Sequence, residues 1–160
     1  MTGNPSDHRG PDNPVESISW DEANQFCRKE GLRLPTEAQW EYACRAGSDG
    51  PYAGPLDKLG WFLDNSGEGE TTHPVQQKLA NAWGIYDMHG NVREWCADWY
   101  GPYADGKDPV SDPQGPGTGE YRVARGGSVK HNAANCRSAA RFAVKAASES
   151  IGFRPVKLLD

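Results

Sequence analysis

Two helix start signals in the first third of the sequence constrain this chain more than any other feature. Ser19 is followed by Glu22, and Thr36 is followed by Gln39. Both pairs match the capping box, in which the first side chain accepts from a backbone N–H and the second reaches back. The sequence therefore predicts two helices, which begin directly after Ser19 and directly after Thr36.

Each of these helices has an apolar face and a glycine that ends it. Trp20, Ala23, Phe26 and Cys27 would lie on one face of the first helix, and Gly31 offers a stop. The second helix would run to Gly47, and its apolar residues are Ala38, Trp40, Tyr42 and Ala43.

Short strands separated by long loops are expected in the rest of the chain. Alternation predicts a strand over 14–19, and two more strands are expected over 121–128 and 151–156. Residues 47–82 are irregular, and the Trp- and Gly-rich stretch 81–103 favours tight turns with little regular structure. Residues 104–119 favour a surface loop. The fold class expected is α+β around a small, mostly antiparallel sheet, with residues 1–13 as an extended or frayed polar lead-in and 14–160 as a single domain.

Composition indicates a loop-rich domain held together by aromatic side chains. Hydrophobic residues make up only 36% of the sequence, and 19 Gly and 12 Pro favour turns. Six Trp and six Tyr compensate, because each buried ring removes a large apolar area from water.

Charge and hydropathy exclude two classes of partner. The net charge is −5 and the basic residues are scattered, so nucleic acid is not an expected partner. The sequence contains no run of 18 apolar residues, so membrane insertion is not expected. The N-terminal residues contain no apolar segment typical of a secretion signal, which leaves a cytoplasmic place or display on a phage or cell surface open.

The four cysteines, Cys27, Cys44, Cys96 and Cys136, form no CxxC pair, so a zinc ribbon is not supported. Buried free thiols are expected, although a disulfide stays open.

An irregular segment near the C-terminal end lies between two glycine-containing motifs, which we call the frame. Arg125-Gly-Gly-Ser128 precedes it and Ile151-Gly-Phe-Arg154 follows it. Long loops inside compact domains are unusual and often functional. The two expected strands would hold the ends of this segment together.

Six sequence motifs in a fixed order resemble those of a known family: PVESISWDEANQFC, RLPTEAQWEYACRAG, NAWGIYDMHGNVREW, RVARGGS, CRSAAR and IGFRPV. Together they resemble the formylglycine-generating-enzyme-like (sulfatase-modifying factor) family, from about Pro14 to Val156. The resemblance implies a C-type-lectin-like fold with two helices, a small sheet and long loops.

The resemblance also implies an oxidase site, which this sequence matches only in part. The family's founding activity converts a sulfatase cysteine to formylglycine with copper held by two cysteines. Counting from the RGGS motif, the second falls on Cys136, but the first falls on His131. Cu(I) prefers two thiolates, so copper and oxidase activity are not expected. Other relatives use a histidine-rich iron site, and the spacing of the four histidines does not suggest one.

Structural calcium is a further implication of the resemblance. Matched residue by residue, the ligands would be the side chains of Asp87 and Glu94 and the carbonyls of Gly90 and Val92. Calcium takes six to eight oxygen ligands, and a glycine-containing turn can direct carbonyls inward. The alternative is that the two carboxylates cap amides or pair with arginines.

The motifs of the frame also resemble the variable proteins of diversity-generating retroelements, a branch of the same fold. In that branch, error-prone copying at adenines turns chosen Asn codons into scattered residues. Lys130, Lys145 and Glu149 are weaker candidates for diversified positions, because an Asn codon gives Lys or Glu only if its third base also changes. Val129 stands where these proteins usually have a Trp. The expected ligand-binding positions are Val129, Lys130, His131, Asn132, Ala140, Phe142, Ala143, Val144, Lys145, Ser148, Glu149 and Ser150.

These observations favour a non-catalytic binding domain with a diversified surface, whose partner is an unknown protein or surface ligand. The alternatives are a copper oxidase or another metal-dependent oxidoreductase, or a family member whose loops have drifted. Substitution of Phe142 or His131 is expected to change ligand choice and leave folding intact. Substitution of Trp95, Arg137 or Gly127 is expected to harm folding. Typical relatives have a further section before the motif at Pro14, so an open sheet edge and self-association are also expected.

Overall fold

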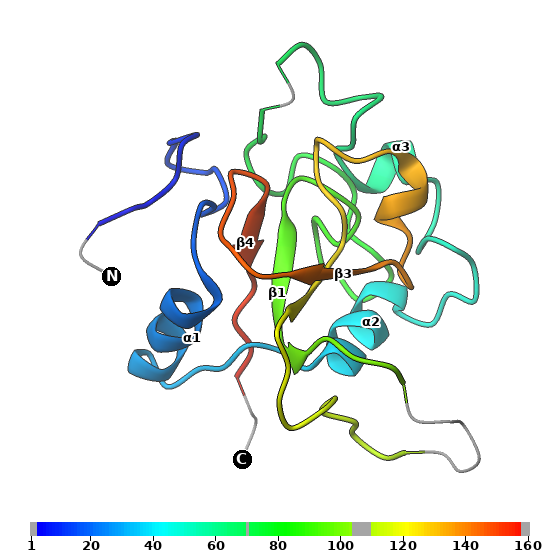
Figure 1. Cartoon of the computed structure of the whole chain (residues 1–160). Coiled ribbons are helices and arrows are strands. Elements are labelled where there is room, and N and C mark those ends of the chain that lie inside the picture. Colours follow the sequence, from blue (N-terminus) through cyan, green and yellow to red (C-terminus); the bar gives the residue numbers. More distant parts are fainter. Residues whose placement is uncertain (1–2, 70, 104–109, 158–160) are drawn as a thin grey trace.

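The computed structural model describes residues 3–69, 71–103 and 110–157, which form two helical layers around a small sheet (Figure 1). The sheet has four strands in the order β3-β2-β1-β4. The elements in chain order are α1 (Trp20–Lys29), α2 (Glu37–Arg45), the short α3 (Leu56–Leu59), β1 (Arg93–Trp99), β2 (Arg122–Arg125), the 3-10 turn η1 (Ala133–Cys136), β3 (Arg141–Val144) and β4 (Ile151–Phe153).

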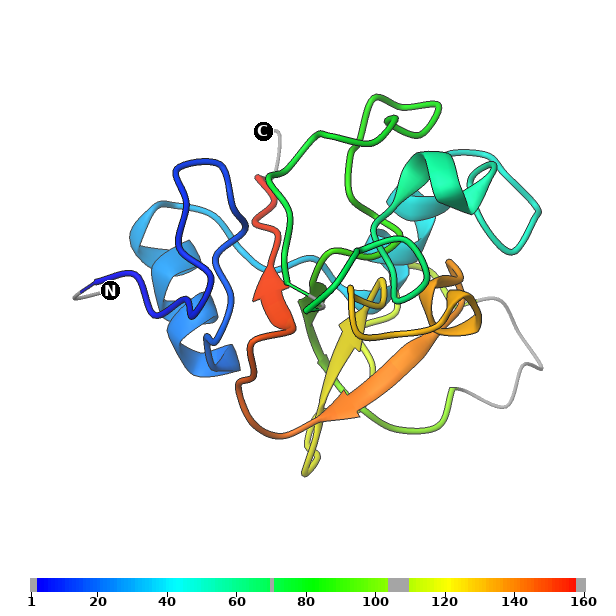
Figure 2. The same cartoon turned by 90° about the horizontal axis from the view of Figure 1, so that it is seen from above.

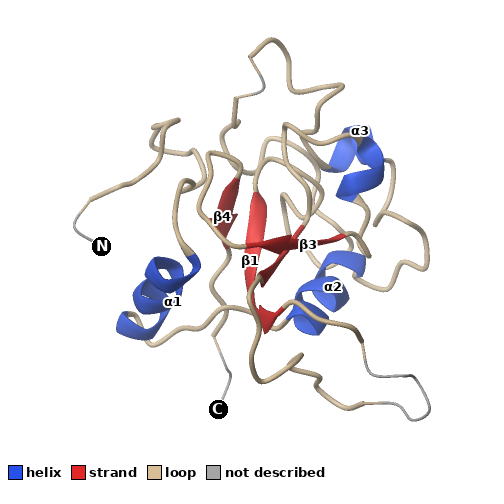
Figure 3. Ribbon diagram, viewed as in Figure 1, coloured by secondary structure: helices blue, strands red, loops and turns tan. Residues whose placement is uncertain are grey.

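Both predicted helices are present, with complete capping boxes (Figure 3). The side chains of Ser19 and Thr36 accept from the backbone N–H groups of Glu22 and Gln39. The side chains of Glu22 and Gln39 in turn accept from the backbone N–H groups of Ser19 and Thr36. The first helix ends before Gly31, which has a φ of 69°. The left-handed cap of α2 is Ala46, one residue before the expected glycine.

The stretch 81–103 was predicted to form tight turns with little regular structure, and this prediction is wrong for its second half. It contains β1, the longest strand, which pairs antiparallel with β2 and parallel with β4. Alternation fails to reveal this strand because both of its faces are covered. Trp95 belongs to a core cluster with Ile18 and residues of α1, whereas Cys96 belongs to a second cluster with Trp40 of α2. Neighbouring strand residues point to opposite faces, so β1 separates two apolar layers. Figures 1 and 2 show α1 on one side of the sheet and α2 and α3 on the other.

Two other strand predictions need correction. Residues 14–19 form no strand; Glu16 makes one isolated bridge with Gly152, and Ser17 interrupts the extended backbone with a φ of 56°. Conversely, the framed segment contains β3, which pairs antiparallel with β2. This edge strand is short and mostly half-exposed, so its sequence shows no clear alternation. The strands expected over 121–128 and 151–156 are present as the shorter β2 and β4.

The polar lead-in is not frayed where the structure describes it. Ser6 is buried and its hydroxyl accepts from the Glu16 backbone N–H at 3.1 Å. Asp12 accepts from the Val75 N–H at 2.8 Å through its carbonyl. Part of the predicted loop over 104–119 lies outside the described residues, and 110–119 is largely exposed. Among the helices described, none has the length and apolar character needed to cross a bilayer.

Candidate functional site

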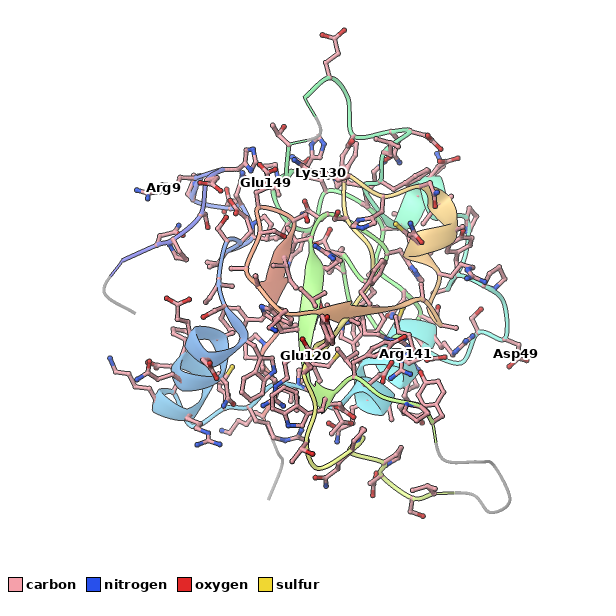
Figure 4. All side chains as sticks on the ribbon, viewed as in Figure 1. Arg9, Asp49, Glu120, Lys130, Arg141 and Glu149 are labelled. Atoms are coloured by element: carbon pink, nitrogen blue, oxygen red, sulfur yellow. The ribbon has the colours of Figure 1, made fainter. Side chains whose placement is uncertain are left out.

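The expected binding positions come from three stretches that meet on one face. Lys130 forms an ion pair with Glu149, which joins the first stretch to the third (Figure 4). The ring of His131 lies 5.0 Å from that of Phe142, which joins the first stretch to β3. The structure therefore brings the three stretches together. We call the following positions the varied surface: Lys130, His131, Asn132, Ala140, Phe142, Ala143, Val144, Lys145, Ser148 and Glu149.

Two of the expected positions do not belong to this surface. Val129 is 1% exposed, and its backbone bonds to Asn91 and Ser66. Ser150 is 6% exposed, and both its hydroxyl and its carbonyl accept from Arg93. These side chains support the surface from below and do not reach a ligand.

Phe142 and Val144, expected as apolar ligand contacts, are only half-exposed. Both pack against the core cluster that contains Trp95 and Ile18. The expectation that Phe142 can change without an effect on folding is therefore corrected, because part of its ring stabilises the core. The exposed positions are Asn132, Ala143 and Lys145.

The part of the frame that precedes the segment, Arg125–Ser128, is buried, in contrast to most of the positions that follow it. Arg125 is 0% exposed and donates to the carbonyls of Ser138, Ala139 and Ala140 at 2.8–3.1 Å. Arg137, expected to be needed for folding, is instead exposed, and its Nε donates to the Ala134 carbonyl at 2.8 Å. Arg125 is thus the arginine that holds the segment in place.

His131 and Cys136, at the positions of the oxidase's copper pair, are both engaged inside the protein. The Nδ1 atom of His131 lies 2.6 Å from the Ser128 hydroxyl, and burial, with a smaller effect of Arg93, lowers the pKa of His131 to about 4. Cys136 is fully buried, and burial raises its pKa to about 12, so its sulfur is a thiol at neutral pH. Within the described ranges, no cluster of three or more His, Cys, Asp or Glu side chains suits a metal ion.

The candidate calcium residues gather in one place. Asp87, Gly90, Val92 and Glu94 all line a pocket of about 400 Å³. One carboxylate oxygen of Asp87 accepts from the Gln76 N–H at 2.8 Å, and the other is buried without a partner. Glu94 is less available, because it accepts from Arg154 at 2.7 and 3.0 Å and from the Trp40 indole at 2.7 Å. The unpaired Asp87 oxygen fits a cation, whereas Glu94 matches the arginine-paired alternative.

Two further residues contact the framed segment: His89 lies next to Cys136, and Arg93 lies next to Phe142. His89 is 1% exposed; its Nδ1 lies 2.9 Å from the Cys136 carbonyl oxygen and its Nε2 accepts from the Ala53 N–H. The sequence analysis missed Arg93, whose guanidinium lies 5.5 Å from the Phe142 ring. No signal in the sequence distinguishes Arg93 from other arginines, because its contacts with Phe142, Ser148 and Ser150 come from residues far away in the chain.

The fold and the sequence of this chain match those of known proteins. The sequence model of one protein family, the sulfatase-modifying factor enzyme 1-like domain, matches residues 2–159. The chain belongs to this family. Among its relatives, the formylglycine-generating enzyme of Streptomyces coelicolor is 39% identical over 90% of this chain and 52% of that protein. The chain spans about half the length of the curated formylglycine-generating enzymes that it matches.

Two solved structures of high similarity extend the comparison within this fold. Treponema denticola variable protein 1 superposes with a TM-score of 0.86 and 28% identity, over 97% of this chain and 77% of that one. PvdO from Pseudomonas aeruginosa superposes with a TM-score of 0.83 and 28% identity, over 92% of this chain and 63% of that one. The expected α+β, C-type-lectin-like fold of the formylglycine-generating-enzyme type is confirmed.

Proposed function

We propose that this chain is a non-catalytic ligand-binding domain with a diversified surface, a variable protein of a diversity-generating retroelement. The observation that carries the proposal is the contrast between frame and interior. Gly127, Ser128, Cys136 and Ile151 are buried, whereas most of the positions between them reach the surface on one face. The similarity to the Treponema denticola variable protein over nearly the whole chain supports the same function.

The oxidase alternative comes from the curated relatives, several of which are formylglycine-generating enzymes. The residues present do not fit the copper pair of that activity. His131 replaces one thiolate, and Cys136 is a buried thiol whose pKa is raised to about 12 by burial. A metal that prefers two thiolates would meet one protonated sulfur and one imidazole bonded to Ser128.

The DNA around the gene tests the diversified surface. We expect an imperfect copy of codons 122–156, with adenines at the varied positions, next to a reverse-transcriptase gene. Intact flanking DNA that contains neither would contradict the proposal that this surface is diversified.

An activity assay tests the non-catalytic part separately. Incubation with copper and a sulfatase-type cysteine peptide is expected to give no aldehyde, as judged by hydrazide labelling and mass spectrometry. Aldehyde formation that disappears in Cys136→Ser would favour the oxidase instead.

We also propose a structural calcium ion at the pocket lined by Asp87, Gly90, Val92 and Glu94. Calcium, when bound, would supply positive charge to a buried carboxylate and tie the turn at Gly90 to the start of β1. The unpaired buried oxygen of Asp87 supports this proposal.

Thermal unfolding with and without a chelator tests the calcium site. Calcium is expected to raise the Tm of the native chain, and EGTA to reverse the rise. Asp87→Asn should abolish the effect, whereas Asp49→Asn, on an exposed loop, should retain it. An equal response of both variants would contradict the site.

A further inference from the structure

Arg93 of β1 lies beneath residues from all three stretches of the varied surface. Its Nη2 donates to the hydroxyls of Ser148 and Ser150 at 3.2 and 3.0 Å. The Phe142 ring lies 5.5 Å from the guanidinium carbon, and the charge of Arg93 contributes to the lowered pKa of His131. Arg93 itself is outside the varied positions, because β1 precedes the frame.

The charge of Arg93 is not neutralised by the protein. Four other buried or half-buried arginines, Arg45, Arg125, Arg141 and Arg154, each have a carboxylate within 4.0 Å. Two further half-buried arginines have partners of another kind: Arg122 lies over the rings of Trp20 and Trp99 at 3.5 and 3.4 Å, and Arg33 donates to the Leu34 carbonyl and the Gln39 side chain. No carboxylate partner of Arg93 occurs among residues 3–69, 71–103 and 110–157, and its Nε is buried without an acceptor. Glu149, the one acidic residue among the varied positions, is paired with Lys130.

A half-buried, uncompensated guanidinium is costly, since removal of a charge from water is repaid only by a partner. Serine hydroxyls satisfy hydrogen bonds but carry no charge. A carboxylate would supply both the negative charge and acceptors that match the planar guanidinium.

We propose that Arg93 is a fixed anchor for a carboxylate group of the ligand, from an acidic side chain or a chain terminus of a protein. This proposal rests on the proposed binding function. The varied positions around Arg93 would select among ligands, while Arg93 would be common to all versions of the surface. Diversification would then act within one class, the acidic protein surfaces.

An NMR titration with acetate tests the anchor without the natural ligand. At neutral pH and constant ionic strength, replacing chloride with acetate should shift the Arg93 Nε–Hε signal in a saturable way, with half-saturation on the order of 10 mM. The exposed Arg137 should shift little and without saturation. Equal, linear shifts at both arginines would overturn the anchor. A stronger saturable response to sulfate than to acetate would overturn the choice of a carboxylate.

A peptide selection tests the anchor in binding. Peptides selected from a random library on the native chain should be rich in Asp, Glu or free C-terminal carboxylates. They should bind Arg93→Met at least about tenfold more weakly, equivalent to about 1.4 kcal/mol, but bind Arg137→Met unchanged. If Arg93→Met does not fold, Arg93→Gln takes its place. Selected peptides that bind the Arg93 variant equally well would overturn the anchor alone. A failed selection together with saturable acetate binding would instead contradict the proposed binding function.

Discussion

Gly127 illustrates how single residues of the frame fix the segment that follows. Its φ is 73°, in the left-handed region that side chains disfavour. A Cβ atom at this position would lie 2.4 Å from the Cys136 sulfur and 3.0 Å from the Asn135 carbonyl oxygen. Both the conformation and the space therefore require glycine where the frame meets η1.

Gly127→Ala is expected to lower the free energy of unfolding by about 2–4 kcal/mol, because strain and overlap add. Urea denaturation followed by circular dichroism measures the loss. Gly117→Ala is the matched control, since a Cβ at Gly117 meets nothing within 4 Å. Similar losses in the two variants would show that the contact with Cys136 is unimportant.

His131 makes stability depend on pH. Its folded pKa of about 4 lies below the ordinary value of 6.5, chiefly because of burial. Between pH 4 and pH 6.5, His131 is therefore protonated in the unfolded chain but largely neutral in the folded chain. The contribution to stability is complete above pH 6.5 and is lost as the pH falls toward 4.

His131→Gln should remove this dependence. Between pH 7 and pH 4 the native chain is expected to lose up to about 3 kcal/mol more stability than the variant. Urea denaturation at both pH values gives the difference. A variant that loses as much stability as the native chain would contradict the assignment of this pH effect to His131.

At the scale of elements, one ionic network joins α2 to β2 and β3. Glu37, at the first position of α2, accepts from Arg141 of β3 at 2.8 and 2.6 Å, and Arg125 of β2 lies at 3.5 Å. Glu37 is 5% exposed, so these bonds form away from most solvent. The edge strand that carries Phe142 thus depends on a helix far away in sequence.

Glu37→Gln is expected to cost about 2–4 kcal/mol, because it leaves the Arg141 guanidinium without its carboxylate and leaves the buried Arg125 with Glu41 alone. Glu120→Gln is the control: its pair with Lys145, the residue directly after β3, is 63–65% exposed, and its loss should cost less than about 0.5 kcal/mol. The test is the difference between the two losses in urea denaturation. A loss for Glu37→Gln as small as that of the control would mean that the network does not hold β3.

At the scale of the whole molecule, packing of the two apolar layers replaces covalent cross-links. All four cysteines are free and buried, as expected from the sequence. Cys27 of α1 belongs to the apolar layer between α1 and the sheet. Cys44 of α2 and Cys96 of β1 belong to the layer between α2 and the sheet. Burial raises the pKa of Cys44 to about 12 and raises that of the other thiols in the same direction.

The folded chain is therefore expected to be unreactive toward a thiol reagent such as DTNB at pH 8. Four thiols should react once guanidinium chloride unfolds it, and a reductant should leave the Tm unchanged. A Tm that falls when the reductant is added would indicate a disulfide.

The sequence by itself determined the elements that depend on local chemistry. Capping side chains lie within three residues of their partners, so Ser19 and Thr36 located the starts of both helices to the residue. The order of the family motifs likewise identified the fold and the frame of the varied segment.

Only the tertiary structure decided which faces are covered and which charges are paired. β1 is hidden from sequence patterns because α1 and α2 bury its two faces. Val129 and Ser150 were assigned to the surface, although contacts with Asn91 and Arg93 bury them. Arg93 could not be distinguished from other arginines, because the missing carboxylate is a property of its neighbours in space. Burial and pairing arise between residues far apart in the chain, and the sequence alone does not specify that geometry.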